Sequence, residues 1–359
     1  MPALPVTKEI NILISIQERL HAFWAGERPD EIPYTIYQWE QQAAKDDPRW
    51  QPMFDDGLGV VSHLSAFRSH TPGLEVVYTD YEENGDKVRR ETQKTPVGEI
   101  YQTWVNGWHH RYLVQAPEDY RVMEWIARNT VFEPDYERYE ANIAALPRWG
   151  VPLSCVGRTP LQTMLVDNAG IEHFAYHLFE YEEEILSLYE AMLENFRRIV
   201  HLVAGAPGRF VSNLENFTAE SLGPKRYEKF LLPVYEECFP VLHQAGKIVG
   251  SHYDGRTKSC RELIARAPID LIESLTEPNE GDQTLAEARA VWPEKLFWCN
   301  IRVGDYQLPP AKLRERVLGM VAAGAPDGKR LAFEVSEHLP KNWMDSMPVV
   351  LQALHETRY

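Results

Sequence analysis

Cysteine is scarce in this sequence of 359 residues. The four cysteines, Cys155, Cys238, Cys260 and Cys299, lie 83, 22 and 39 residues apart. These separations exclude the CxxC pairs of zinc ribbons, and four cysteines are too few for a disulfide scaffold in a chain of this length. We therefore expect reduced thiols and a cytoplasmic protein.

Long apolar runs are absent as well. No stretch approaches the ~18 consecutive apolar residues of a membrane-spanning helix. Residues 1–20 carry Lys8, Glu9, Glu18 and Arg19 around a short apolar stretch, which is not the order of a secretion signal. The sequence predicts a soluble protein that does not contact membranes.

Positive charge is in deficit. Lysine and arginine number 37 against 53 aspartates and glutamates, so the net charge is −16. Binding to nucleic acid or to anionic lipid depends on clustered basic residues, which this chain does not gather into runs. Glycine-rich dinucleotide loops and phosphate loops are missing too, which argues against an open nucleotide-binding sheet.

The sequence does contain a regular alternation of strand-like and helix-like segments. Eight short runs of strand character are each followed by a segment of helical periodicity. The predicted strands are residues 32–37, 58–63, 150–155, 209–214, 247–252, 269–275, 295–300 and 330–335. This pattern predicts a (β/α)8 TIM barrel as a single domain over residues 1–359, with a doubly wound open sheet as the competing fold.

Two additions to the barrel are predicted. Ile12, Ile16, Leu20 and Phe23 recur at helical spacing, which indicates an N-terminal helical extension within residues 1–30. Residues 74–93 form two alternating runs on either side of Asn84-Gly85, the strongest hairpin signal in the chain. We expect this β-hairpin to be an insertion into the barrel.

Polar residues gather where the predicted strands end, and the active sites of barrels lie at the carboxyl ends of their strands. His252 and Asp254 follow the fifth strand, where they can bind a divalent cation or act as a base and its orienting partner. A helix cap formed by Asp254 would explain the same pair without chemistry. Glu337 and His338 follow the eighth strand and are either further partners of this pair or a solvated charge cluster.

Eight short motifs occur in order along nearly the whole chain. They are ERL (18–20), GERPDEIP (26–33), TPVG (95–98), PEDY (117–120), LHQAGK (242–247), HYDG (252–255), GD (281–282) and EHLP (337–340). With these motifs the chain resembles the uroporphyrinogen decarboxylase superfamily. The resemblance implies a (β/α)8 barrel with an N-terminal helical extension, in agreement with the strand count.

Two departures point to one branch of that superfamily. True uroporphyrinogen decarboxylases carry an arginine-rich segment after the first strand, whereas residues 33–44 (PYTIYQWEQQAA) contain no arginine or lysine. Corrinoid-linked methyltransferases that act on coenzyme M are similar at a zinc site written His-x-Cys, with a second Cys three residues before a Pro. The matching positions here are His252, Asp254 and Glu337, so carboxylates replace both thiolates.

The resemblance therefore implies a metal site formed by His252, Asp254 and Glu337, with zinc as the expected ion. A site of one His and two carboxylates favours oxygen over sulfur. We expect a metal-dependent methyltransferase of the O-demethylase type, which moves a methyl group from a small methoxylated, aromatic compound to Co(I) of a separate corrinoid protein. The chain lacks an Asp-x-His-x-x-Gly segment, so we expect the partner protein to hold the cobalamin. The resemblance also suggests a homodimer.

Further site residues are expected at the strand ends. Asp254 and Glu215 are the candidate catalytic carboxylates, and the candidate substrate-binding residues are Asn213, Tyr37, Trp39, Tyr253, Asn300 and Arg302. The three aromatic residues either line a pocket or pack in the core. Two alternatives stay open: a carboxy-lyase that acts on an acidic substrate through Asp254 or Glu215, and a binding module without chemistry.

Overall fold

The computed structural model describes residues 14–43, 45–336 and 338–358. Eight parallel strands form a closed barrel: β1 (Tyr34–Tyr37), β2 (Leu58–Leu64), β9 (Gly150–Gly157), β10 (Phe210–Asn213), β11 (Ile248–His252), β12 (Leu271–Leu275), β13 (Leu296–Ile301) and β14 (Leu331–Val335). The strands neighbour one another in this order, and β14 pairs with β1 to close the ring. The predicted (β/α)8 fold is confirmed, and the strands fall where the sequence places them.

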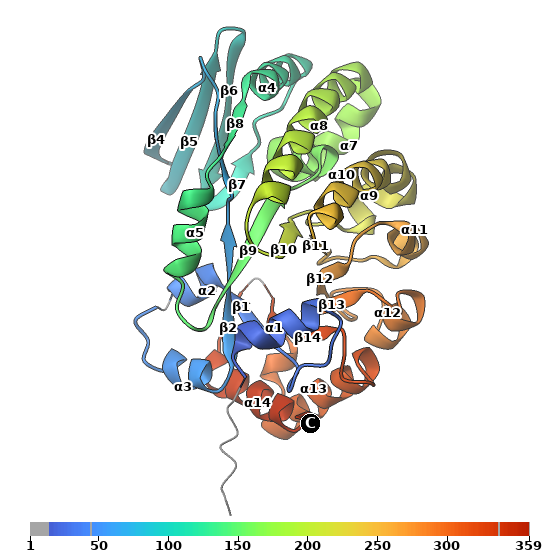
Figure 1. Ribbon diagram of the computed structural model, residues 1–359. Coiled ribbons are helices and arrows are strands. Elements are labelled where there is room, and N and C mark those ends of the chain that lie inside the picture. The colour runs from blue at the N-terminus through green and yellow to red at the C-terminus, as the bar shows by residue number, and fades with distance from the viewer. Residues whose placement is uncertain (1–13, 44, 337, 359) are drawn as a thin grey trace, which may run out of the picture.

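Helices follow the barrel strands and form the outer layer (Figure 1). They are α2 (Gln38–Ala43), α3 (Trp50–Asp55), α6 (Pro160–Thr163), η1 (Met164–Ala169), α7 (Ile171–Glu180), α8 (Glu182–Gly205), α9 (Ala219–Arg226), η2 (Tyr227–Leu231), α10 (Leu232–Gln244), η3 (Lys258–Cys260), α11 (Arg261–Arg266), α12 (Leu285–Val291), η4 (Asp305–Gln307), α13 (Pro310–Gly324) and α14 (Trp343–His355). In α10, Leu232, Tyr235, Phe239 and Leu242 recur every three or four residues and are all buried, so one face of the helix packs on the barrel.

The N-terminal helix α1 (Ile16–Trp24) closes the amino-terminal end of the barrel. Ser15 caps it, because its hydroxyl accepts from the backbone N–H of Glu18 while the Glu18 carboxylate reaches back to Ser15. Trp24 stacks on Phe210 at 4.9 Å between ring centroids, and both belong to an apolar cluster with Trp298 inside the barrel. Phe210 begins β10, which places this plug at the end of the barrel opposite the strand carboxyl ends.

The chain between β2 and β9 forms an inserted subdomain. Its elements are β3 (Phe67–His70), β4 (Glu75–Glu83), β5 (Asp86–Thr95), β6 (Gly98–Val105), β7 (Trp108–Arg111), α4 (Pro117–Asn129), β8 (Val131–Pro134) and α5 (Tyr136–Ala144). The predicted hairpin is present as β4 and β5, with positive φ angles at Asn84 and Gly85.

That hairpin is half of a larger sheet. Strands β4, β5, β6 and β7 form a four-stranded antiparallel sheet, which projects from the barrel beside α4 in Figure 1. The second half carries the same turn signal, because Asn106 and Gly107 also have positive φ angles between β6 and β7. The sequence therefore held two Asn-Gly turns, and the expected single hairpin was incomplete.

Two further expectations concern membrane-spanning helices and the state of the cysteines. Within the described residues, no helix combines the length and the apolar character that crossing a membrane requires. The four cysteines are free thiols.

Candidate functional site

The inside of the barrel changes character along its axis. The apolar plug contains Val61 of β2, Leu271 of β12 and Ala332 of β14. Because alternate residues of a strand face the same side, the residues two positions further on, His63, Glu273 and Glu334, also face the interior. Polar and titratable side chains therefore replace the apolar core toward the carboxyl end of the barrel.

His252, the last residue of β11, lies between two carboxylates. Its Nδ1 is 3.8 Å from Oε2 of Glu273, and its Nε2 is 3.9 Å from Oδ2 of Asp254. Burial by itself would lower the pKa of His252, but the close carboxylates of Asp254 and Glu273 outweigh it and raise this pKa to about 10. The imidazole is thus held as a cation in a nearly closed environment, with only 8 % of its surface exposed.

Glu273 and Glu334 are two buried carboxyl groups in opposite states. Glu273 accepts hydrogen bonds from the Tyr37 hydroxyl (3.2 Å) and the Ser212 hydroxyl (3.3 Å). Burial would raise the pKa of Glu273, but His252 lowers it below its usual value. Burial and the charge of Glu273 raise the pKa of Glu334 well above its usual value. The environment therefore favours the ionised form of Glu273 and the protonated form of Glu334.

A cavity of about 250 Å³ opens beside His252, and we call it the barrel-mouth cavity. Its lining residues are Tyr37, Trp39, His63, Arg158, Leu214, Asn216 and His252. The rings of Tyr37 and Trp39 stack at 4.3 Å, and Trp39 in turn stacks on His63 at 5.7 Å. Burial lowers the pKa of His63, and neither of its ring nitrogens has a hydrogen-bond partner among the described residues. Three flat rings thus form one wall of the cavity.

The structure brings some of the predicted site residues together. His252, Tyr37 and Trp39 line the barrel-mouth cavity, and Asp254 lies next to His252. Glu337, the third predicted metal ligand, lies outside the described residues. His63, Glu273, Glu334 and Arg158 also surround this site and were not among the residues expected from the sequence. Strand alternation was the signal for the first three, because each stands two residues beyond an apolar inward position.

Other predicted residues lie behind the barrel wall instead. Glu215 is fully buried and accepts from the Tyr235 hydroxyl (2.7 Å) and the Thr159 hydroxyl (3.0 Å). Burial raises the pKa of Glu215 to about 7 although these hydrogen bonds oppose it. Tyr253 is also fully buried and donates to Tyr235 at 3.2 Å. Since Tyr253 follows the inward-facing His252, it points to the other side of the sheet, and neither residue lines the barrel-mouth cavity.

Asn213, Asn300 and Arg302 connect structural elements. The Asn213 amide donates to the carbonyl of Gly157 at 2.8 Å and so joins β10 to β9. The Asn300 amide donates to the Thr276 hydroxyl at 3.2 Å. Arg302 is paired with Asp305, with Nε 3.0 Å from Oδ2. None of the three lines the barrel-mouth cavity.

The donor set at His252 was compared with the needs of a metal ion. Across the described ranges, no three His, Cys, Asp or Glu side chains are grouped closely enough to hold one. His252 and Asp254 supply two donors, and Glu273 faces the other imidazole nitrogen. A metal-binding histidine usually directs its second N–H to a carboxylate in this way. Once His252 releases its proton, the pair can bind a divalent ion, and a complete site needs a further donor.

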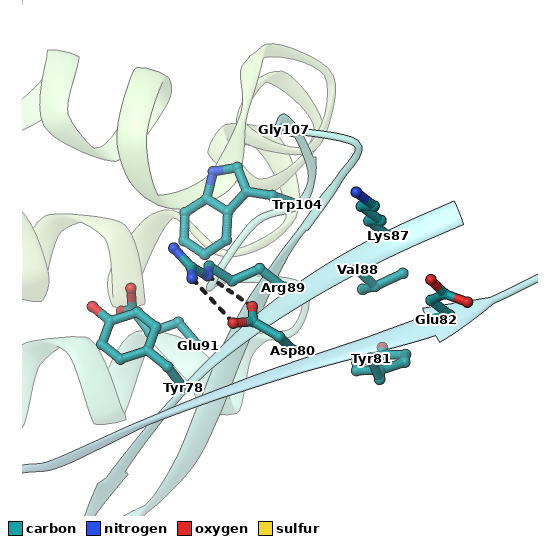
Figure 2. A pocket seen from close by; sticks show the side chains of 10 residues that line it. All are labelled: Tyr78, Asp80, Tyr81, Glu82, Lys87, Val88, Arg89, Glu91, Trp104 and Gly107. Atoms are coloured by element: carbon teal, nitrogen blue, oxygen red, sulfur yellow. Dashed lines mark hydrogen bonds and ion pairs between the residues drawn. The ribbon is translucent and has the colours of Figure 1, made fainter. Parts of the chain in front are cut away.

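A larger hollow of about 820 Å³ lies on the inserted sheet, far from the strand ends of the barrel. Figure 2 shows that its lining side chains come from β4, β5, β6 and the turn at Gly107. Arg89 and Asp80 pair with each other there at 2.8 Å, and Tyr78 is hydrogen-bonded to Glu91, which raises the pKa of Tyr78. Because these polar groups satisfy one another, the barrel mouth is the better candidate site.

Comparison with known proteins gives a likeness of fold only. No protein-family model and no curated sequence matches the chain. A methyltransferase from Methanosarcina mazei superimposes with a TM-score of 0.55 over 96 % of this chain and 100 % of that chain, at 10 % sequence identity. A B12-independent methionine synthase from Shewanella sp. W3-18-1 gives a TM-score of 0.40 over 86 % of each chain, at 10 % identity. Because this TM-score is below 0.5, nothing is inferred from that likeness. The chain thus shares the barrel fold of the Methanosarcina protein.

Proposed function

We propose that this protein is a metal-dependent methyltransferase whose barrel mouth binds a small methoxylated, aromatic compound. The methyl group passes to Co(I) of a separate corrinoid protein, which makes this chain the O-demethylase component. His252 and Asp254 hold the metal, zinc in the first instance, together with Glu337. The fold shared with a methyltransferase supports the reaction class.

One observation carries the proposal. His252 is fixed at the carboxyl end of β11 with Nε2 toward Asp254 and Nδ1 toward Glu273. Tyr37, Ser212 and the charge of His252 hold Glu273 ionised, so Glu273 orients the imidazole and Nε2 is directed to the same side as Asp254. A His–Asp pair on a solvated surface would not be held by buried hydrogen-bonded residues of this kind.

The cavity next to His252 suits an aromatic substrate. Tyr37, Trp39 and His63 offer stacked ring faces on which a methoxylated ring can lie. His63 is neutral because burial lowers its pKa, so the wall adds no charge there. A divalent ion bound by His252 and Asp254 would stabilise the negative charge that develops on the substrate oxygen as its methyl group leaves.

Metal analysis of the purified full-length chain tests the proposal. We expect one divalent ion for each chain after exposure to zinc, and loss of that ion in Asp254→Ala. Asp327→Ala is the matched control, since Asp327 is an exposed aspartate in the turn that precedes β14, and it should bind zinc as the wild type does. The absence of a bound ion in the wild type would refute the metal site.

Methyl transfer itself is tested with a reduced corrinoid carrier and a panel of methoxylated aromatic compounds. Methylation of cobalt changes its visible spectrum, and we expect that change with the wild type and with Asp327→Ala but not with Asp254→Ala. If no compound of the panel methylates cobalt while zinc binds, the substrate class is wrong and the metal site stands.

A carboxy-lyase acting on an acidic substrate is the second candidate. Two cations, Arg158 and the protonated His252, line the barrel-mouth cavity and favour an anion there. Asp254 would then handle the proton, because Glu215 does not reach the cavity. Release of carbon dioxide that persists in the presence of a chelator would favour this candidate over methyl transfer.

A further inference from the structure

A second cavity lies beside the barrel mouth, and we call it the side pocket. Its volume of about 370 Å³ is within the range of small-molecule sites. It lies between α4 of the inserted subdomain and α8, which pack against each other. The lining is mostly apolar and includes Met123, Ile126, Phe132, Met192, Phe196 and Ile199.

Arg158 and Asp167 are the charged residues among those that line the side pocket. Nη1 of Arg158 lies 3.2 Å from both carboxylate oxygens of Asp167. Nε of Arg158 is buried and has no hydrogen-bond partner within the described part of the chain. Arg158 also lines the barrel-mouth cavity, so it stands where the two cavities meet.

The remaining polar side chains of the pocket are already engaged. The Asn195 amide donates to the carbonyl of Ala127 at 2.7 Å, and the Thr163 hydroxyl donates to the carbonyl of Thr159 at 3.1 Å. The first bond joins α8 to α4, and the second lies within the turn of α6 and its N-cap residue. The guanidinium of Arg158 is therefore the group best able to bind a polar part of a ligand.

We propose that the side pocket binds a compound with an apolar body and a single carboxylate, which pairs with Arg158. A guanidinium matches a carboxylate with two parallel N–H donors, and Asp167 occupies only Nη1. The apolar body gains by leaving water against α4 and α8. A second charge on the ligand would face an apolar wall, which is costly, so one carboxylate is the limit. This site does not depend on the proposed methyl transfer.

Calorimetric titration of the full-length chain tests the proposal with two probes of equal length, octanoate and octan-1-ol. We expect octanoate to bind about tenfold more tightly or better, because the alcohol lacks the negative charge and the second oxygen that accept paired hydrogen bonds from the guanidinium. In Arg158→Gln this preference should vanish. Equal affinity of the wild type for both probes, or octanoate binding that Arg158→Gln leaves unchanged, overturns the proposal.

Three further variants place the ligand and keep the test decisive should Arg158→Gln not fold. Met192→Trp fills the side pocket and should abolish octanoate binding, whereas Trp39→Ala alters only the barrel-mouth cavity and should leave it unchanged. Asp167→Asn removes the competing carboxylate and should strengthen octanoate binding several-fold without affecting octan-1-ol. The opposite pattern, loss in Trp39→Ala and none in Met192→Trp, would place the anion in the barrel mouth and refute the side pocket.

Discussion

The two halves of the barrel interior use the same strands for different purposes. Toward the amino-terminal end, Phe210, Leu271, Trp298 and Ala332 pack against α1 in a sealed apolar plug. Toward the carboxyl end, the same strands β12 and β14 present Glu273 and Glu334. A step of two residues along a strand thus separates a position that stabilises the fold from one that supports chemistry.

The comparison also shows how the fold tolerates buried charge. Glu273 is stabilised as an anion by His252, Tyr37 and Ser212, whereas Glu334 avoids charge by keeping its proton. Oε1 of Glu334 accepts from the backbone N–H (3.1 Å) and the hydroxyl (2.9 Å) of Ser274. An ionised group therefore needs counter-charge nearby, and a second carboxyl group in the same interior stays neutral.

The largest effect is expected in the apolar plug. Trp298 is fully buried, contacts Phe23 and Phe210 edge to face, and donates from Nε1 to the Thr35 hydroxyl at 3.1 Å. Trp298→Ala should lower the free energy of unfolding by about 3–5 kcal/mol, measured by denaturant titration. Trp108→Ala is the control, because Trp108 is 77 % exposed and its loss should have little effect. A cost below about 1 kcal/mol for Trp298→Ala would mean that the plug is not the stabilising half.

The next largest effect is expected in the carboxyl-terminal half of the barrel interior. Glu273→Gln keeps the shape of the side chain but removes its charge, so the pKa of His252 should fall from about 10 toward its ordinary value of 6.5. The free energy of unfolding should drop by about 1.5–3 kcal/mol with the loss of charged hydrogen bonds. NMR titration of the His252 ring and denaturant titration measure the two changes. An unchanged His252 pKa would show that Asp254 alone sets it.

Glu334→Gln should raise the free energy of unfolding, and the gain should depend on pH. In the unfolded chain Glu334 loses its proton near pH 4.5, whereas the folded protein holds it to higher pH. As pH rises above about 4.5 the unfolded state therefore binds fewer protons, and the wild type loses stability by up to about 1.4 kcal/mol per pH unit. The glutamine variant lacks this loss, so its advantage should grow from pH 5 to pH 7 in denaturant titrations. A constant difference over that range would contradict the protonated state.

The smallest effect is expected on the inserted sheet. Arg89 and Asp80 form an ion pair whose side chains are 59 % and 65 % exposed. Arg89→Gln should leave the denaturation midpoint unchanged, because solvent and salt weaken such pairs. This result would set the exposed sheet apart from both halves of the barrel interior. A clear shift of the midpoint would show that the insertion stabilises the whole chain.

Much of the fold could be predicted from the sequence, and less of the site. The pair His252 and Asp254 was visible because both residues follow one strand. Glu273 and Glu334 were harder to find, since each lies inside a strand and comes from a different part of the chain. Tyr253 and Glu215 do not line the barrel-mouth cavity, because a residue at a strand end can point into the barrel or behind it. Register, which sets that choice, depends on how all eight strands pack.

The sequence by itself determined the eight strand–helix units, the scarcity of cysteine and the excess of negative charge, because periodicity and composition are local properties. Only the tertiary structure decided which polar residues meet. It placed His252 of β11 against Glu273 of β12 and brought Arg158 to the junction of two cavities. Closure of the barrel is the physical reason, since it brings residues distant in sequence into contact and determines which of them lose their water.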